Sequence, residues 1–173
     1  MKRLLAAAAV VLVAALAFYW FAIRDETVVA TVEVPQLAAQ IGTGEEAIPV
    51  AADGEVIRWG YKPEHIHLPL LPLAEPPKGG QLKGPALEQV EVLGAVPPAL
   101  RRFVAASRSG ESGVDVELTS GIELRFGDSS QAERKWEAAA AVLADPSITT
   151  LSYVDLHDPS HPAYGGEGHA LPE

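Results

Sequence analysis

The sequence predicts an α+β protein, in which an N-terminal transmembrane helix precedes a mixed, mainly antiparallel β-sheet with helices packed on one face. Three observations predict this class. Residues 4–23 carry no charge, residues 114–126 alternate apolar and charged side chains around a glycine turn, and an amphipathic helical pattern then leads into a β-branched run.

The apolar run near the N-terminus begins at Leu4 and ends at Ile23. A helix rises 1.5 Å per residue, so this run spans about 30 Å, the thickness of the hydrocarbon core of a bilayer. Lys2 and Arg3 precede the run. The excess of positive charge predicts cytoplasmic residues 1–3, a single transmembrane pass and an extracytoplasmic remainder.

A cleavable signal peptide is the alternative for this segment, because Ala15-Leu16-Ala17 has the small-x-small form of a cleavage site. Residues 18–23, however, stay apolar and contain four aromatic residues. Aromatic residues of this kind are typical of a membrane interface, which favours a retained anchor.

Composition excludes several functions. The formal net charge is −10, so nucleic acid is a poor partner for this surface. The chain contains no cysteine, which excludes a disulfide and any cysteine-based metal or redox site. The residues from Ile48 onward suffice for one domain.

Within that domain, residues 60–84 are rich in proline and glycine and predict an extended or looped segment. Pro85 favours the start of a short amphipathic helix that ends before Pro97-Pro98. Residues 99–104 predict a further helical turn, with Leu100 and Phe103 directed inward.

The C-terminal part has the clearest pattern. Residues 114–118 and 122–126 predict an antiparallel hairpin across Ser120-Gly121. A helix follows, with Ser130 as the expected N-cap and Glu133 completing a capping box. Its inward positions are expected to be Ala132, Trp136, Ala139 and Leu143, and Asp145-Pro146 ends it. Residues 148–156 predict the last long strand.

These motifs occur in an order that resembles the extracytoplasmic β domain of the bacterial cell-division family FtsQ, also called DivIB. The resemblance rests on Leu124-Arg125-Phe126-Gly127, a helix that carries Lys135, and the string of residues 151–156 before a proline-containing tail. Upstream, residues 48–56 resemble the first hairpin of that domain, and residues 68–72 its proline-spaced apolar stretch. The resemblance implies a β domain at residues 48–165, followed by a flexible tail at 166–173.

Family members also carry a small POTRA domain next to the membrane. Residues 24–47 are too few for it, so this segment is expected to be a linker or a remnant of that module. An impaired paralogue of the intact protein is therefore an alternative.

No residue pattern predicts catalysis or a cofactor. His65 and His67 would share one face of a strand, and His157, His161 and His169 lie near the C-terminus, but no carboxylate is spaced as a further metal ligand. Ser112 lacks a nucleophile motif. An anchored extracytoplasmic metal-binding protein or enzyme that uses these histidines remains the alternative from another class.

The resemblance implies a non-enzymatic scaffold of the divisome, located in the plasma membrane at the division septum. Its expected partners are FtsB and FtsL, which are small coiled-coil division proteins. The expected mechanism is strand addition at an open C-terminal sheet edge. The residues carried over as partner contacts are Ser152, Val154, Asp158, Ser160, Tyr164, Gly165 and Gly166.

Two of these positions depart from the family. Asp158 stands where some members have an aromatic residue, and Gly166 stands where some have tryptophan. Pro159 and Pro162 remove two backbone donors, so pairing of the edge is expected to be partial. The alternative is a tail that is simply frayed.

Overall fold

A computed structural model describes residues 35–58 and 67–172. The predicted anchor, residues 4–23, lies outside the described residues, as do residues 1–3 and residues 24–34 of the predicted linker. No helix in the part of the chain that the structure describes is long and apolar enough to cross a membrane.

The described residues form one mixed sheet with the strand order β2-β1-β3-β4-β5-β6-β7-β8. Three neighbouring pairs are parallel, β1 with β3, β3 with β4 and β6 with β7, and the others are antiparallel. The strands are β1 (Leu37–Ile41), β2 (Ile48–Ala51), β3 (Leu70–Leu71), β4 (Val104–Gly110), β5 (Gly113–Leu118), β6 (Glu123–Gly127), β7 (Thr150–Asp155) and β8 (Ala163–Ala170).

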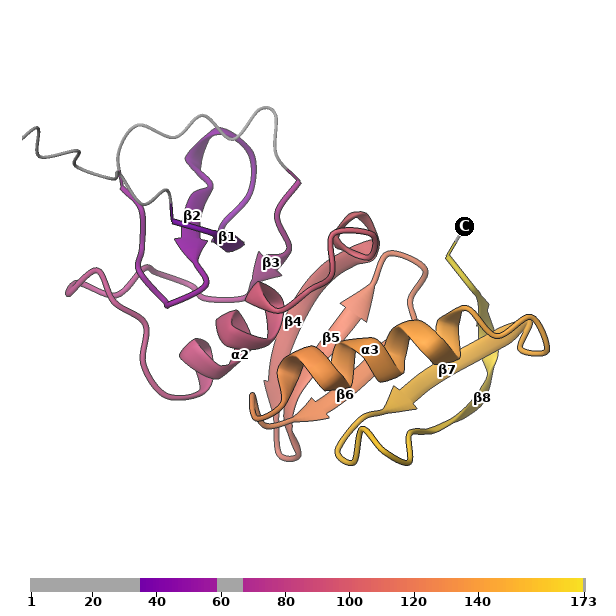
Figure 1. The fold of residues 1–173 in the computed structure, drawn as a ribbon. Coiled ribbons are helices and arrows are strands. Elements are labelled where there is room, and N and C mark those ends of the chain that lie inside the picture. Colours follow the sequence, from indigo (N-terminus) through magenta and orange to yellow (C-terminus); the bar gives the residue numbers. More distant parts are fainter. Residues whose placement is uncertain (1–34, 59–66, 173) are drawn as a thin grey trace, which may run out of the picture. The chain divides into compact units, whose positions relative to one another are not determined.

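Two α-helices, α2 (Pro85–Gly94) and α3 (Ala132–Leu143), lie over the same face of this sheet (Figure 1). The prediction of an α+β sheet with helices on one face is therefore confirmed for the described residues. The start of α2 at Pro85 is also as predicted, because proline at the first helical position loses no intrahelical hydrogen bond.

The predicted hairpin is present as β5 and β6, paired antiparallel. Val114, Val116 and Leu118 are buried, whereas the residues between them are only partly buried, as alternation requires. Gly121 turns the chain with a φ of 91°, in the left-handed region that favours glycine.

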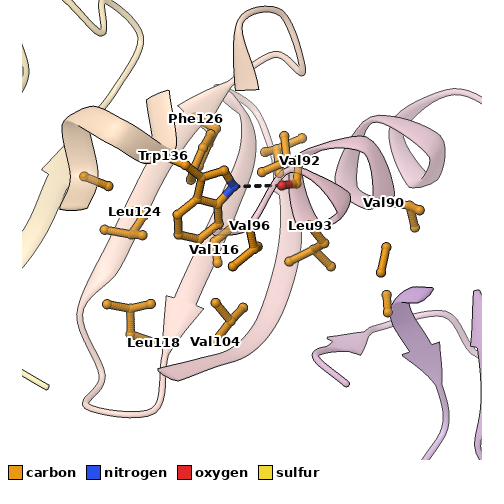
Figure 2. Packing of buried hydrophobic residues seen from close by; sticks show 14 of the residues in the cluster. Val90, Val92, Leu93, Val96, Val104, Val116, Leu118, Leu124, Phe126 and Trp136 are labelled. Atoms are coloured by element: carbon orange, nitrogen blue, oxygen red, sulfur yellow. Dashed lines mark hydrogen bonds between the residues drawn. The ribbon is translucent and has the colours of Figure 1, made fainter. Parts of the chain in front are cut away.

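The helix α3 also forms as predicted, with Trp136, Ala139 and Leu143 buried. Figure 2 shows Trp136 beside Phe126, and their ring centroids lie 4.9 Å apart. The indole Nε1 donates a hydrogen bond of 2.8 Å to the carbonyl oxygen of Val92. This bond ties α3 to α2 at the centre of the core.

The predicted cap of α3 is wrong. The N-cap is Gln131, which has a left-handed φ of 55° and makes no side-chain capping bond. Ser130 instead donates from its backbone N–H and its hydroxyl to Asp128. The reason is Lys135, whose buried ammonium donates to Asp128 and to the carbonyl of Phe126, and so fixes the loop before the helix in another conformation.

Residues 99–104 differ from the prediction as well. The helical turn is a short 3₁₀ segment, Arg101–Phe103, and Val104 already begins β4. Leu100 packs against the core, but Phe103 is only partly buried and lies under the guanidinium of Arg102 at 4.4 Å. Of the segment predicted to be extended or looped, residues 60–66 lie outside the described residues, and the remainder contributes the two-residue strand β3.

The largest difference concerns the C-terminus. The strand predicted at residues 148–156 is β7, but it is not the last strand, because β8 follows and pairs with it antiparallel. Thus β7 lies between β6 and β8, and β8 forms the end of the sheet (Figure 1). The sheet runs from Leu37 to Ala170, beyond the expected interval 48–165 at both ends.

Candidate functional site

The outer strand β8 presents a free edge. One side of it pairs with β7, and no other strand of the described residues pairs with its opposite side. Seven of its eight residues are exposed, and three of them are glycines. Backbone N–H and C=O groups along such an edge can pair with an added strand, which makes β8 a candidate binding site.

The pairing of β8 with β7 contains an irregularity. Tyr153 lies opposite Gly165 and Leu151 lies opposite His169, so Ser152 faces three residues of β8. The hydroxyl of Ser152 donates a hydrogen bond of 3.3 Å to the carbonyl oxygen of Glu167. The edge is therefore regular at Ala163–Gly165 and bulges outward after it.

Tyr153 supports the regular part of the edge. A Cβ atom placed on Gly165 would lie 3.5 Å from the Tyr153 hydroxyl and 3.8 Å from the ring, so the phenol covers the glycine that faces it. The guanidinium of Arg125 stacks over this ring, 4.3 Å from its centroid. The Arg125 Nε in turn donates to Glu123 at 2.6 Å, and this bond raises the pKa of Arg125.

Sequence reasoning missed Tyr153 and Arg125 as residues of this site. The sequence did contain a signal that these two side chains lie on the face of the sheet away from the helices. Each lies next to a buried residue of its strand, and neighbouring side chains in a strand point to opposite faces. Only the register, which puts Tyr153 opposite Gly165, shows that the ring reaches the edge.

The loop from β7 to β8 is held by short polar contacts. The Nδ1 of His157 lies 2.7 Å from a carboxylate oxygen of Asp155, and its Nε2 lies 3.3 Å from the carbonyl oxygen of Ser112. Both partners accept hydrogen bonds, so both are satisfied when both ring nitrogens carry protons. The bond to Asp155 accordingly raises the pKa of His157.

Further along this loop, Asp158 accepts a hydrogen bond of 2.9 Å from the backbone N–H of Ser160, and this bond lowers the pKa of Asp158. The His161 ring lies 3.1 Å from the other oxygen of the same carboxylate. A shallow hollow of about 200 Å³ separates the loop from α3, with Arg134, Glu137, Ala138, Pro159 and Ser160 around it. The loop is thus an ordered turn that delivers the chain into β8.

The structure separates the expected contact residues into three groups. Tyr164, Gly165 and Gly166 lie in β8 itself, and the Tyr164 side chain is 48% exposed. Asp158 and Ser160 are exposed in the preceding loop. The remaining two lie in β7. Ser152 is beneath the bulge, and Val154 is fully buried in the core, where its side chain cannot reach a partner.

The histidines that the structure describes do not assemble into a common metal centre. Among residues 35–58 and 67–172, no group of three or more His, Asp or Glu side chains is placed to hold a metal ion. His65 lies outside the described residues, and His67 is exposed. His169 lies against Gly121, at the opposite end of β8 from the loop that holds His157.

Comparison with known families bears on the same part of the chain. The family described as cell division protein FtsQ/DivIB, C-terminal, matches residues 39–157. The chain belongs to the FtsQ/DivIB family. FtsQ/DivIB proteins act in bacterial cell division and are generally non-enzymatic. The family resemblance inferred from the sequence motifs is thereby confirmed.

The FtsQ/DivIB match begins inside β1 and ends at His157, so it takes in the sheet from β2 to β7 together with both α-helices. The outer strand β8 follows the matched region. No curated protein sequence matches the chain.

Proposed function

We propose that the chain is a membrane-anchored, non-enzymatic scaffold of the divisome that binds a strand of a small coiled-coil division protein of the FtsB/FtsL type at the edge of β8. Residues 4–23 would hold it in the plasma membrane at the septum, with residues 1–3 in the cytoplasm. The residues between this anchor and β1, which begins at Leu37, would connect the anchor to the domain that carries the sheet.

One observation carries this proposal. The outer strand β8, which follows the region matched to the FtsQ/DivIB family, has an exposed backbone edge, and its regular segment Ala163–Gly165 carries no charged side chain and no proline. Proteins usually protect such an edge with lysine, proline or a covering loop. An ordered edge segment without such side chains supports strand addition, in which main-chain hydrogen bonds supply affinity and side chains on alternate faces supply specificity.

The side chains beside this segment support the same conclusion. On the face of the sheet away from the helices, Tyr153 lies next to the small Gly165. A side chain of the added strand can therefore pack against the phenol ring. Tyr164 points to the other face and is the exposed large apolar residue of the described chain. It would supply an aromatic contact two residues before Gly166, the position where some family members carry tryptophan.

Affinity capture tests the proposal in cells. The full-length protein, tagged and solubilised in detergent, is expected to bring down small single-pass coiled-coil division proteins, identified by mass spectrometry. Ser160→Trp should abolish their recovery, because Ser160 is exposed in the turn that leads into β8 and a large ring there obstructs an incoming strand.

Glu88→Trp is the matched control. Glu88 is exposed on α2, which is separated from β8 by several strands, so this variant should recover the same partners as the parent. Equal recovery with Ser160→Trp and Glu88→Trp would contradict binding at the β8 edge. Recovery of no division protein by the parent would contradict the scaffold function itself.

A further inference from the structure

An edge that can accept a partner strand can also accept the same strand of a second copy. Two identical antiparallel strands pair around a two-fold axis, which is the commonest symmetry of homo-oligomers. β8 has eight residues, no proline and no lysine or arginine, and most of its side chains are exposed. Its composition therefore offers little protection against self-pairing along its full length.

The backbone of β8, rather than its side chains, opposes pairing with a second copy. Between the pair Tyr153 with Gly165 and the pair Leu151 with His169, β7 contributes one residue and β8 contributes three. Two extra residues thus bulge out of the edge. They divide β8 into a segment of three paired residues, Ala163–Gly165, and a segment of two, His169–Ala170. Bulges of this kind are a means by which natural sheets end pairing at an edge.

The bulge is built into the sequence at three positions. Gly166 has a φ of 86°, and a Cβ atom there would lie 2.5 Å from the Ser152 side chain. A Cβ atom on Gly168 would lie 2.8 Å from the Ser152 hydroxyl oxygen. Ser152 also donates a hydrogen bond to the carbonyl oxygen of Glu167, which lies between the two glycines. The Ser152 side chain therefore contacts all three residues of the bulge.

We propose that the Gly166–Gly168 bulge prevents two copies of this chain from pairing through β8, and that Ser152 is the residue that positions it. Two edges that each carry the bulge cannot run side by side beyond the three-residue segment, because the displaced backbone of each copy interrupts the ladder. A pairing of three residues is shorter than most strands in folded proteins. In a pair of copies both edges carry the bulge, whereas a partner strand without one meets a displaced backbone on β8 alone, so the bulge disfavours a second copy more than a different strand. The consequence for a partner strand rests on the proposed function, and the exclusion of a second copy does not.

Deletion of Gly166 and Glu167 tests this inference. The deletion removes the two extra residues and leaves Tyr153 opposite Gly165, Ser152 opposite Gly168 and Leu151 opposite His169, which is a regular ladder. The full-length chain in detergent micelles, measured by size-exclusion chromatography with light scattering, should have the protein mass of one copy, 18.3 kDa. The deletion variant should reach twice that mass as its concentration rises.

Two further variants test whether association of the deletion variant occurs through β8. Tyr164→Lys in the deletion background should restore the mass of one copy, because a lysine on an edge strand opposes pairing. A dimer that survives this change would place the association elsewhere and overturn the inference, as would a folded deletion variant that stays monomeric or a wild-type protein that already dimerises through β8. If circular dichroism shows that the deletion variant does not fold, Ser152→Gly decides. Dimerisation of that variant supports the inference, and a monomer overturns it.

Discussion

Trp136→Ala is expected to lower the free energy of unfolding by about 3–5 kcal/mol, the usual cost of removing a buried aromatic side chain. Trp136 has no exposed surface and packs against Phe126 at the centre of the core. Its loss leaves a cavity between α3 and the sheet that the neighbouring strands, fixed by their own pairing, cannot fill. Urea unfolding followed by circular dichroism measures the change.

The hydrogen bond donated by the indole nitrogen of Trp136 is a second contribution to the stability of the fold. The last carbonyl groups of a helix have no partner within it, and Val92 is one of the last four residues of α2. Its carbonyl oxygen accepts the bond from Trp136, while the carbonyls of Glu91 and Leu93 accept bonds from Ala95 and Val96.

Trp136→Phe is the control that separates the two contributions, because it keeps much of the apolar volume and leaves the Val92 carbonyl without this donor. It should cost about 1–3 kcal/mol, the penalty for one buried group left unpaired. A loss below about 1 kcal/mol for Trp136→Ala would mean that this side chain does not lie at the centre of the core.

Lys135→Met is expected to destabilise the protein by about 2–4 kcal/mol, although methionine reproduces the apolar stem of lysine up to Cε. Lys135 is 2% exposed, and its ammonium donates to the carbonyls of Phe126 and Asp128 and to the Asp128 carboxylate. Methionine leaves the buried carbonyl of Phe126 without this partner. The same unfolding experiment measures the loss.

The stability of the protein at acid pH reports on the contact between Lys135 and Asp128. The bond from Lys135 lowers the pKa of Asp128 to about 2. A carboxylate whose pKa is lowered by folding adds stability above its unfolded pKa of about 4, and this contribution is lost as the pH falls toward 2. Asp128 is 68% exposed, so screening by solvent keeps that contribution small.

Asp128→Asn should therefore cost less than Lys135→Met, since both backbone carbonyls keep their donor. If Asp128→Asn proves the more costly of the two, the carboxylate and not the carbonyls would be the main partner of the ammonium. An unchanged stability in Lys135→Met would contradict the buried position of this side chain.

The parts of the fold that could be predicted are those whose pattern is local. Residues 114–126 alternate strictly around a glycine turn, and Trp136, Ala139 and Leu143 follow helical spacing, so β5, β6 and α3 were predictable. The cap of α3 was not, because the ammonium of Lys135 organises that loop through bonds to residues seven and nine positions away.

Two of the strands that were not predicted, β4 and β8, had weak local patterns for a related reason. β4 contains Ala105, Ala106 and two serines, residues with little preference for strands, and its conformation is fixed by pairing with β5. β8 contains three glycines, which favour flexible segments, so its residues were expected to end the domain as a tail. Its pairing with β7 decides the outcome.

The same limit applies to the candidate site. Asp158, Ser160 and Tyr164 could be proposed from position in a resembling family, but the role of Tyr153 beside Gly165 requires the register of β7 and β8. The bulge around Ser152 likewise follows from counting residues between paired positions, and a single sequence does not contain that count.

The measurement that tests the central claim most directly is amide hydrogen exchange of the full-length protein, with and without the extracytoplasmic segment of the FtsB-type protein from the same organism. Strand addition predicts slower exchange at Ala163–Gly165, because outward N–H groups of β8 gain acceptors from the partner strand. Binding of the segment with unchanged exchange in β8, and slower exchange elsewhere on the domain, would contradict an edge-strand scaffold.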